Sequence, residues 1–347
     1  MVKIRSARIL YSGDDRVLVS RGRHLWQSLD DGLTWSKVCS IPSALLYRLA
    51  LKFSFVSRLL RLGCHHLVPI GENRVVIVFN RKIIWLDMDE GAIYHESDFV
   101  GSRPLSFCSD GKYIYYGEYR SNPERSPVSV WRTGVESPHW KTVLTLDFAR
   151  HIHGVYYDSV SDRFWVTTGD ENSESKVLLC DKEFNIYEII SEGGQQSRVV
   201  QPIFTDDFVC FASDAPEEQN YIYRYDRKLR ETMRVAMVSG PIYFGAVVDH
   251  FILLSTVVEP SKVNDVTSIR LLASKDGFDW RYIAVFKKDV LPMKYFLYGQ
   301  IFFGAIRGIN QYIFFSENGT VRHLKLHRLS VGDIESLWSN SVRIEVH

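Results

Sequence analysis

The sequence predicts an all-β protein, a seven-bladed β-propeller with a helical insertion between its first two blades. One unit recurs seven times: an apolar run, a tight turn containing Gly, Asp or Asn, and a second run rich in aromatic and β-branched residues. The second runs start roughly 40 to 60 residues apart, the interval expected for one four-stranded blade. They begin at Val17, Val75, Tyr113, Phe164, Phe208, Phe251 and Tyr312.

Each unit divides into four strands separated by turn residues. In blade 1 the expected strands are 7–11, 16–20, 24–28 and 34–39, and in blade 4 they are 154–157, 163–168, 176–180 and 185–190. The last strand, 342–346, is expected to form the outer edge of blade 7. On this pattern residues 1–347 form a single propeller domain, which begins with an inner strand and ends with an outer one.

Composition and charge exclude several classes of protein. The net charge of the 347 residues is +1, which gives no support to nucleic-acid binding. No long apolar run follows the N-terminal residues, so we expect no secretory signal and a cytoplasmic location. The five cysteines show no CxxC spacing, which favours buried free thiols in a reducing compartment. No apolar run is long enough to predict a transmembrane segment.

Residues 43–62, between blades 1 and 2, break the strand pattern. The segment reads SALLYRLALKFSFVSRLLRL, in which Arg48, Lys52, Arg58 and Arg61 form a narrow cationic face on a broadly apolar helix. Docking on the propeller or on another subunit would explain such an amphipathic insertion. Peripheral attachment to a membrane is the alternative, because a basic face on an apolar body suits anionic headgroups.

Two short stretches carry a resemblance to a known family. Ser28-Leu29-Asp30-Asp31-Gly32-Leu33-Thr34-Trp35 resembles the Asp-box, or BNR repeat, of sialidase-like propellers, and 274–280 resembles a second copy that is one residue shorter. The resemblance implies a structural turn in which Asp30 accepts backbone N–H bonds, Gly32 adopts a left-handed conformation and Trp35 packs between blades. The Phe/Tyr-Arg-Ile-Pro segment of sialidases is missing, so no sialic-acid site is transferred.

Strand direction predicts where polar side chains gather. In a propeller the first strand of each blade begins, and the second ends, at the same face, so the residues next to these points line one funnel. The residues near the starts of first strands are Arg103, Arg150, His151, His153 and Arg198. Those after the ends of second strands are Glu118, Tyr119, Asp170, Asp214 and Glu259. Long polar loops in blades 3 to 6 would surround them.

Structural explanations exist for each of these residues. The arginines can pair with carboxylates of neighbouring blades, and Asp170 and Asp214 can cap loops. His151 and His153 alternate along one strand and should share a face. They can act as general acid or base, form structural hydrogen bonds, or bind a metal. Because the sequence identifies no third ligand, we assign neither a metal nor another cofactor.

Two functions fit this constellation. The first is an enzyme acting on an acidic oligo- or polysaccharide, for example in surface-polysaccharide metabolism. Its substrate would be held by Arg103, Arg150, Arg198, Glu259 and Tyr243. The second is a non-catalytic propeller that binds a glycan or a protein, since propellers host many functions.

The enzyme could be a lyase or a hydrolase. In a β-eliminating lyase, Arg150 would neutralise a uronate carboxylate, His151 or His153 would remove the C5 proton, and Tyr119 would protonate the leaving oxygen. This constellation resembles that of some seven-bladed polysaccharide lyases. In a hydrolase, carboxylates among Glu118, Asp170 and Asp214 would act as a pair.

Overall fold

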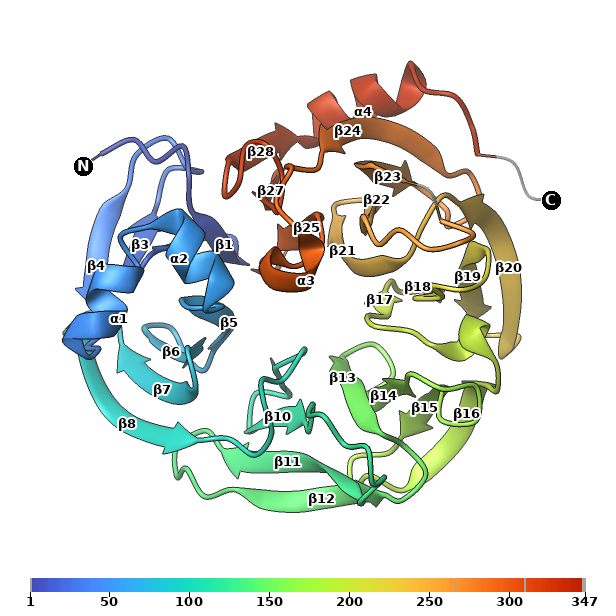
Figure 1. The fold of residues 1–347 in the computed structure, drawn as a ribbon, viewed down its shortest axis with the longest axis horizontal. Helices are drawn as coiled ribbons and strands as arrows, with labels where there is room; N and C mark the ends of the chain where they lie inside the picture. The colour runs from blue at the N-terminus through green and yellow to red at the C-terminus, as the bar shows by residue number, and fades with distance from the viewer. Residues whose placement is uncertain (1, 265, 309, 345–347) are drawn as a thin grey trace. The chain divides into compact units, whose positions relative to one another are not determined.

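The computed structural model describes residues 2–264, 266–308 and 310–344, and within them the strands form seven sheets (Figure 1). These sheets are the seven predicted blades, so the all-β propeller class is confirmed. The chain also divides into two compact units. The first contains the residues up to Phe99, Val248–His250 and Val285–Asn340, and the second contains Val100–Val247, Phe251–Ala284 and the residues from Ser341 onward. The single domain 1–347 therefore stays a prediction.

The first unit holds the sheets of blades 1, 2 and 7. Two of its sheets follow chain order outward, with β26 added parallel to β1, and the third has the order β25-β27-β28. Its strands are β1 (Arg8–Ser12), β2 (Val17–Arg21), β3 (His24–Ser28), β4 (Ser36–Ser40), β5 (Cys64–Pro69), β6 (Arg74–Phe79), β7 (Lys82–Asp87), β8 (Ala92–Asp98), β25 (Gln300–Phe303), β26 (Ala305–Ile306), β27 (Tyr312–Asn318) and β28 (Leu326–Ser330). Its helices are α1 (Leu45–Ala50), α2 (Ser54–Leu59), α3 (Met293–Phe296) and α4 (Val331–Ser339).

The second unit holds four four-stranded sheets, those of blades 3 to 6. Their strands are β9 (Cys108–Ser109), β10 (Tyr113–Gly117), β11 (Val128–Gly134), β12 (Lys141–Leu146), β13 (His151–Asp158), β14 (Arg163–Gly169), β15 (Lys176–Cys180), β16 (Ile186–Glu192), β17 (Ile203–Phe204), β18 (Phe208–Ala212), β19 (Asn220–Asp226), β20 (Glu231–Val238), β21 (Ile242–Val248), β22 (Phe251–Thr256), β23 (Ser268–Ser274) and β24 (Arg281–Lys287). One 3-10 helix, η1 (Gln195–Ser197), follows β16.

Neighbouring sheets of each unit pack through fully buried side chains. In the second unit one cluster joins blades 3 and 4 through Tyr115, Val155 and Phe164, and a second joins blades 4 and 5 through Trp165 and Phe211. Packing between sheet faces is the expected core of a propeller, since each blade buries both of its faces. The inner strands of the unit are thereby held in place, and they carry the polar residues considered below.

The expected outer strand of blade 7 is wrong for the described residues. Arg343 forms an isolated bridge with Arg281 of blade 6, while 345 and 346 lie outside the described residues. Residues near the N-terminus instead line the outer edge of blade 7, where Ser6 bridges Lys325 and the Leu326 amide donates to the carbonyl of Arg5. Helix α4 intervenes because Ser330 and Asp333 form a capping box that starts a helix.

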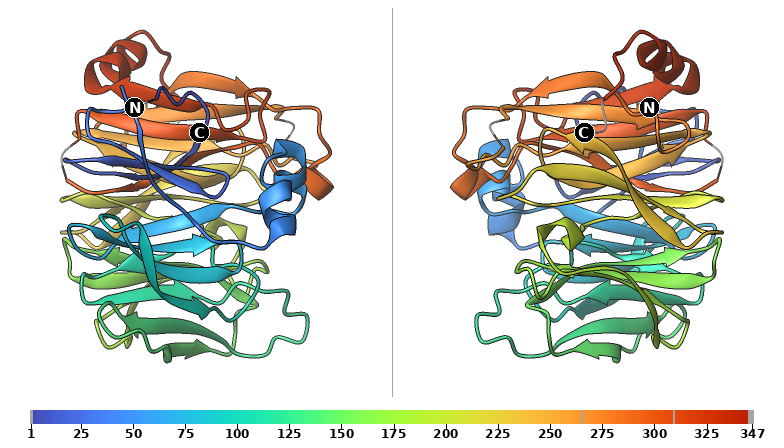
Figure 2. Two further views of the ribbon diagram at one scale, coloured as in Figure 1. Left: turned by 90° about the vertical axis from the view of Figure 1, so that its left-hand side faces the viewer. Right: turned by 90° about the vertical axis from the view of Figure 1, so that its right-hand side faces the viewer.

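The predicted helix over residues 43–62 is also corrected. The segment forms two six-residue helices, α1 and α2, which lie beside α3 (Figure 2). Neither helix contains a buried residue. No helix among the described residues is long and apolar enough to cross a membrane. The five cysteines are free, as expected, and all but Cys108 are buried.

The Asp-box stretch has the local geometry expected from its residues. The carboxylate of Asp30 accepts the Thr34 amide at 2.8 Å, and the Ser28 hydroxyl accepts the Gly32 amide at 2.8 Å. Gly32 has a φ of 80°, and the Trp35 indole donates to its carbonyl at 3.1 Å. Both halves of the predicted turn, the bonded Asp and the buried Trp, are present.

The second copy repeats this arrangement with one residue fewer. The carboxylate of Asp276 accepts the amides of Phe278 and Asp279, both at 2.8 Å. The indole of Trp280 donates to the Gly277 carbonyl at 2.9 Å and is fully buried. The missing residue therefore shortens the turn but keeps the backbone bonds to the Asp and the indole bond to the Gly carbonyl.

A buried ion pair between blades 4 and 5 generates a first prediction. The Arg227 guanidinium donates to both oxygens of Asp158, at 2.5 and 3.0 Å, and the carboxylate is fully buried. Arg227→Ala leaves this charge without its partner and should lower the free energy of unfolding by about 3–5 kcal/mol. Urea unfolding measures the loss. Arg230→Ala removes an exposed pair with Glu188 and should cost far less, and equal losses would contradict the prediction.

Candidate functional site

The side chains of His151 and His153, in the innermost strand of blade 4, converge on each other. Strand β13 pairs with β14, and its register shifts between Ile152 and Gly154, so His153 lies in a bulge. A bulge turns a side chain away from strict alternation. The Nε2 atoms of His151 and His153 are 3.2 Å apart, and both side chains are buried. The expectation that the two rings share a face is confirmed.

Asp170, which follows β14, is the centre of a group of side chains called here the Asp170 cluster. The other members are Arg150, His151, His153 and Arg198. Its Oδ1 lies 3.2 Å from Nε2 of His151 and 3.5 Å from Nε2 of His153. Arg150 reaches Oδ2 at 3.5 Å, and Arg198 reaches Oδ1 at 3.5 Å. Burial acts to raise the pKa of Asp170, but the histidine hydrogen bonds and the Arg198 charge outweigh it and hold the pKa well below its ordinary value. Asp170 is therefore an anion that orients four cationic or polar groups.

The hydrogen bonds assign the histidine protons. Nδ1 of His153 lies 3.2 Å from the Val199 carbonyl, which can only accept, so in the neutral ring Nδ1 carries the proton and Nε2 a lone pair. Burial lowers the pKa of His153, which keeps the ring neutral. Nε2 of His151 then donates toward Asp170 and His153. In the neutral ring this leaves a lone pair on Nδ1 of His151, which is buried without a hydrogen-bond partner among the described residues.

A second acidic group extends the cluster toward blade 6. Asp214 accepts a hydrogen bond from Nε of Arg198 at 3.0 Å, while its Oδ1 is buried with no partner in the described part of the chain. Burial raises the pKa of Asp214 to about 8, against the opposing charge of Arg198 and assisted by Glu259. Glu259 accepts the Tyr243 hydroxyl at 2.5 Å. Arg198 thus joins the Asp170 and Asp214 carboxylates.

Tyr119 lies over the histidines. Its ring centroid is 4.3 Å from that of His151 and 6.4 Å from that of His153. Burial, followed by the charges of Asp170 and Asp214, raises its pKa, so the hydroxyl stays protonated. No hydrogen bond from this hydroxyl is found in residues 2–264, 266–308 and 310–344. Tyr119, Asp170 and Asp214, which were all expected after the second strands of their blades, lie around one cluster.

One predicted residue, Glu118, stands apart from this group. Glu118 points to the neighbouring strand β11, where it accepts the Trp131 indole N–H at 2.7 Å, and it lies 3.5 Å from Arg120. Its side chain therefore has a structural role. Arg103 lies in the segment before β9, and the preceding Ser102 amide donates to the Tyr119 carbonyl at 2.9 Å.

Sequence reasoning missed two residues that shape the site. The Gln195 amide of η1 donates to the Asp170 carbonyl at 2.9 Å and holds the loop that carries the carboxylate. Gly169 leaves room for the site, because a Cβ there would lie 2.6 Å from Cε1 of His153. The Gly193-Gly194 pair, both with positive φ, was the available signal for the tight return of the chain at Gln195.

The side chains of His151, His153 and Asp170 could also hold a metal ion. Ligand atoms of His151, His153 and Asp170 lie within 4.8 Å of one another, so the structure supplies the third ligand that sequence could not identify. Two imidazoles and a carboxylate suit several divalent transition metals. Arg150 and Arg198 oppose a cation, because both lie 3.5 Å from oxygens of the same carboxylate. The assignment of no metal stays a prediction.

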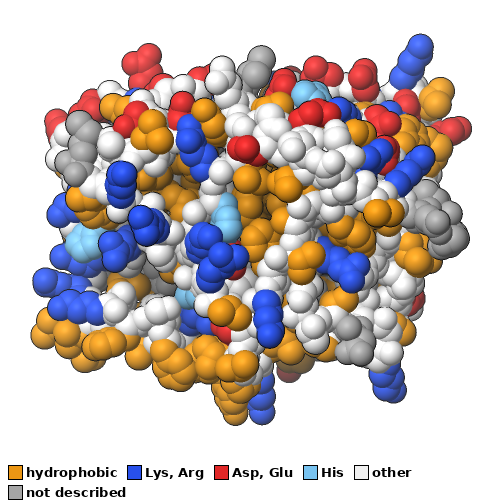
Figure 3. Space-filling view, turned by 90° about the horizontal axis from the view of Figure 1, so that it is seen from above, with side chains coloured by type: hydrophobic (Ala, Val, Ile, Leu, Met, Phe, Trp, Pro, Cys, Tyr) orange, Lys and Arg blue, Asp and Glu red, His pale blue; other side chains and the backbone are white. Residues whose placement is uncertain are grey.

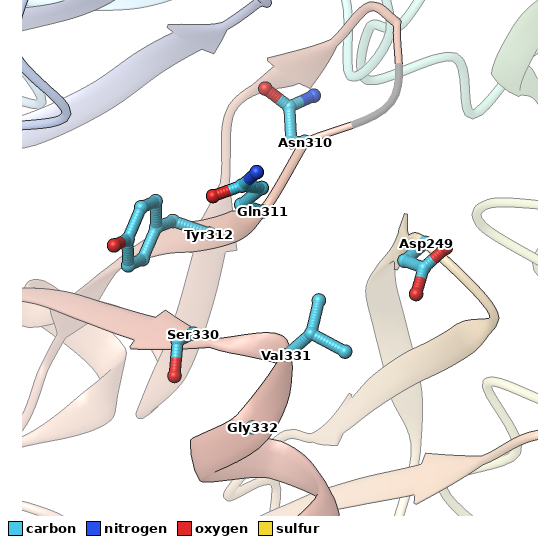
Figure 4. Close-up of a pocket in the computed structure, with 7 residues that line it drawn as sticks. All are labelled: Asp249, Asn310, Gln311, Tyr312, Ser330, Val331 and Gly332. Atoms are coloured by element: carbon cyan, nitrogen blue, oxygen red, sulfur yellow. The ribbon is translucent and has the colours of Figure 1, made fainter.

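A separate cavity of about 380 Å³ lies in the first unit, beside β27, β28 and the start of α4 (Figure 4). Its lining contains a single charged side chain, Asp249, together with polar and small residues. None of the candidate residues described above lines it. It therefore contributes nothing to the chemistry of the Asp170 cluster.

Comparison with known proteins supports the fold alone. No family model matches the chain, and no curated protein does. An oligogalacturonate lyase in complex with manganese has a TM-score of 0.59 at 9% identity, over 96% of this chain and 91% of that one. The WD40 β-propeller domain of Doa1 has a TM-score of 0.57 at 11% identity, over 94% of both chains. The hydrazine synthase of Kuenenia stuttgartiensis has a TM-score of 0.55 at 11% identity, over 81% and 80%.

These matches confirm the propeller architecture that the repeats predicted. They give no evidence of membership in the Asp-box family, so that resemblance remains one of local motif. Similarity at about one residue in ten does not transfer an activity or a ligand.

The packing around Gly169 generates a second prediction. Gly169→Ala places a methyl group against His153 and within 3.1 Å of Cγ of Arg198, which must displace one of them. We expect a loss of about 1–3 kcal/mol in the free energy of unfolding and shifted imidazole resonances for His151 and His153. Gly332→Ala, in helix α4, is the control, since the Cβ added there would lie 3.8 Å from its nearest neighbour, Oγ of Ser330. Unchanged imidazole resonances in Gly169→Ala would contradict the assigned packing.

The burial of Asp214 generates a prediction for the pH dependence of stability. A raised carboxyl pKa means that the folded state favours the protonated form, so its stabilising contribution is present at low pH. It is lost as the pH rises from 3.8 to about 8. Over this interval the free energy of unfolding of the wild type should fall relative to that of Asp214→Asn, which cannot ionise. Urea unfolding of both proteins at several pH values between 3.8 and about 8 measures the change, and parallel curves would refute it.

Proposed function

We propose that the protein cleaves an acidic oligo- or polysaccharide by β-elimination at the cluster around Asp170. The observation that carries this proposal is the arrangement of His151. The Nε2 of His151 donates to Asp170 at 3.2 Å, and in the neutral ring its Nδ1 carries a lone pair with no hydrogen-bond partner among the described residues. This nitrogen is buried, so a substrate would have to displace the side chains that cover it. A carboxylate that orients a histidine so that the other nitrogen can take a proton is a recurrent arrangement for a general base.

The remaining groups fit the other needs of this reaction. The substrate's uronate carboxylate would be bound by Arg150, whose side chain is 31% exposed, with Arg198 behind it. His151 would remove the proton at C5, the electron pair would form the C4–C5 double bond, and the bond from C4 to the leaving oxygen would break. Tyr119, kept protonated by its raised pKa, would donate its proton to that oxygen. The products are an unsaturated uronyl end and a new reducing end.

Hydrolysis by paired carboxylates is less well supported. A retaining or inverting hydrolase needs one carboxylate that is free to attack or activate water and one protonated acid. Asp170 is engaged by two histidines and two arginines, and Glu118 is bound to Trp131. Asp214, with a pKa raised to about 8, has the character of an acid but lacks an available carboxylate partner.

A non-catalytic propeller is the second candidate, favoured by the pairing of charges within the cluster. Asp170 and Asp214 both contact Arg198, as expected if the charges of the site serve only to neutralise one another. Shifted pKa values for Asp170, Asp214 and Tyr119 favour catalysis over this reading, since catalytic sites are where such shifts gather. The oligogalacturonate lyase match shows that this fold can carry a lyase, which supports the proposal by analogy only. A cytoplasmic role in surface-polysaccharide metabolism remains part of the proposal.

The test is incubation of the purified protein with a panel of uronate-containing glycans. Ultraviolet absorbance follows unsaturated products and a colorimetric assay follows reducing ends. We expect both to increase together. His151→Ala and Tyr119→Phe should each lower kcat by about 10²- to 10⁴-fold, because general acid–base catalysis contributes this much. Arg150→Ala should raise KM.

His250→Ala, at an exposed turn, is the matched control and should retain full activity. Reducing ends without unsaturated product would replace elimination by hydrolysis. Binding without either product would establish the non-catalytic candidate. A parallel assay with a chelator, and with added manganese, decides whether His151 and His153 act as ligands, since metal dependence would contradict the base assigned to His151.

A further inference from the structure

Helices α1, α2 and α3 expose an apolar surface, called here the helical patch, that the Asp170 cluster does not use. Figure 2 shows these helices side by side at one side of the first unit, and apolar, Lys and Arg side chains gather along the lower edge of Figure 3. Leu46 is 79% exposed, Leu45 66% and Phe53 62%. The other exposed apolar residues of the patch are Tyr47, Leu49, Phe55, Leu59, Leu60 and Tyr295. A contiguous apolar surface of this kind marks an interaction site.

The patch is held in a defined position. The Arg58 guanidinium of α2 donates to Asp289 at 2.6 Å and to the Phe296 carbonyl at 3.2 Å. The rings of Phe55 and Phe296 lie 4.6 Å apart. These contacts connect α2 to α3, so the apolar side chains are presented by a fixed support rather than by a loose loop.

The helices of the patch carry charges of one sign, and the neighbouring Asp289 is already paired with Arg58. Residues 43–62 contain three arginines and one lysine and no acidic residue, and Lys294 adds a further cation on α3. Arg48 and Lys52 have no ion pair within the described residues. A second copy of the chain would bring these cations against their own equivalents, because a two-fold contact uses the same surface twice. Anionic headgroups would complement them.

We propose that the helical patch docks the protein on an anionic phospholipid bilayer. Exposed leucine and phenylalanine side chains would enter the boundary between headgroups and acyl chains, while Arg48, Lys52 and Lys294 would lie at the level of the lipid phosphates. Basic residues near such a surface are attracted to its anionic headgroups, and salt screens this attraction. Binding is therefore reversible and sensitive to both lipid charge and ionic strength. It does not depend on the proposed lyase activity.

The experiment is co-sedimentation of the purified full chain with vesicles. One set contains phosphatidylcholine mixed with phosphatidylglycerol, and the other contains phosphatidylcholine alone. We expect binding to the anionic vesicles, weaker binding to the neutral ones, and release as sodium chloride is raised. Leu46→Glu should lower the partition coefficient at least about tenfold, since it removes a leucine side chain that would be buried in the bilayer. Arg48→Ala combined with Lys52→Ala should lower it and flatten the salt dependence.

Leu229→Glu provides a matched control, because Leu229 is 62% exposed on the turn between β19 and β20. It should bind as the wild type does, and all variants should keep the wild-type melting temperature since the altered side chains are exposed. No binding to anionic vesicles, or binding unchanged by Leu46→Glu, overturns the proposal. So does a dimer in sedimentation velocity that Leu46→Glu abolishes in the absence of vesicle binding, which would identify a second copy as the occupant.

Discussion

The candidate site depends on one partly buried carboxylate. Asp170 lies within 3.5 Å of two imidazoles and two guanidinium groups, which come from the start of β13, from the residue just before it and from the chain after η1. An anion that is partly removed from water is costly unless it is paired, so these groups must be held around it. Gln195 holds the backbone of the same residue, and Gly169 gives His153 the space to approach. The geometry of blades 4 and 5 at this point follows from satisfying that single charge.

The same constraint divides the chemistry among neighbouring residues. Asp170 is held as an anion, while burial keeps Asp214 and Tyr119 in their protonated forms and His153 neutral. Acid and base functions at one pH require groups whose pKa values are moved in opposite directions. Here the difference arises because hydrogen bonds and positive charges outweigh burial at Asp170, whereas burial outweighs the charge of Arg198 at Asp214. Asp170 has several hydrogen-bond donors around it, while the second oxygen of Asp214 is buried without one in the described part of the chain.

The helical patch is held in place by interactions different from those of the Asp170 cluster. None of its side chains on α1 and α2 is fully buried, so they gain little from the core. Its position depends instead on the Arg58 ion pair with Asp289 and on one aromatic contact. The cluster and the patch therefore draw on separate physical interactions, and substitution of one should leave the other intact.

The propeller class, the number of blades and most strands were predictable from the sequence, because period-two alternation and turn residues are local signals. Proximity of His151, His153 and Asp170 also followed, since equivalent ends of strands meet at one face. Local patterns could not show that Glu118 turns to Trp131, that 43–62 breaks into two helices, or that blade 7 takes its outer edge from residues near the N-terminus. Those features depend on which distant partner satisfies a charge or an open strand edge. Only the tertiary structure decides which partner is chosen, because contacts between residues far apart in the chain produce no periodic pattern in the sequence.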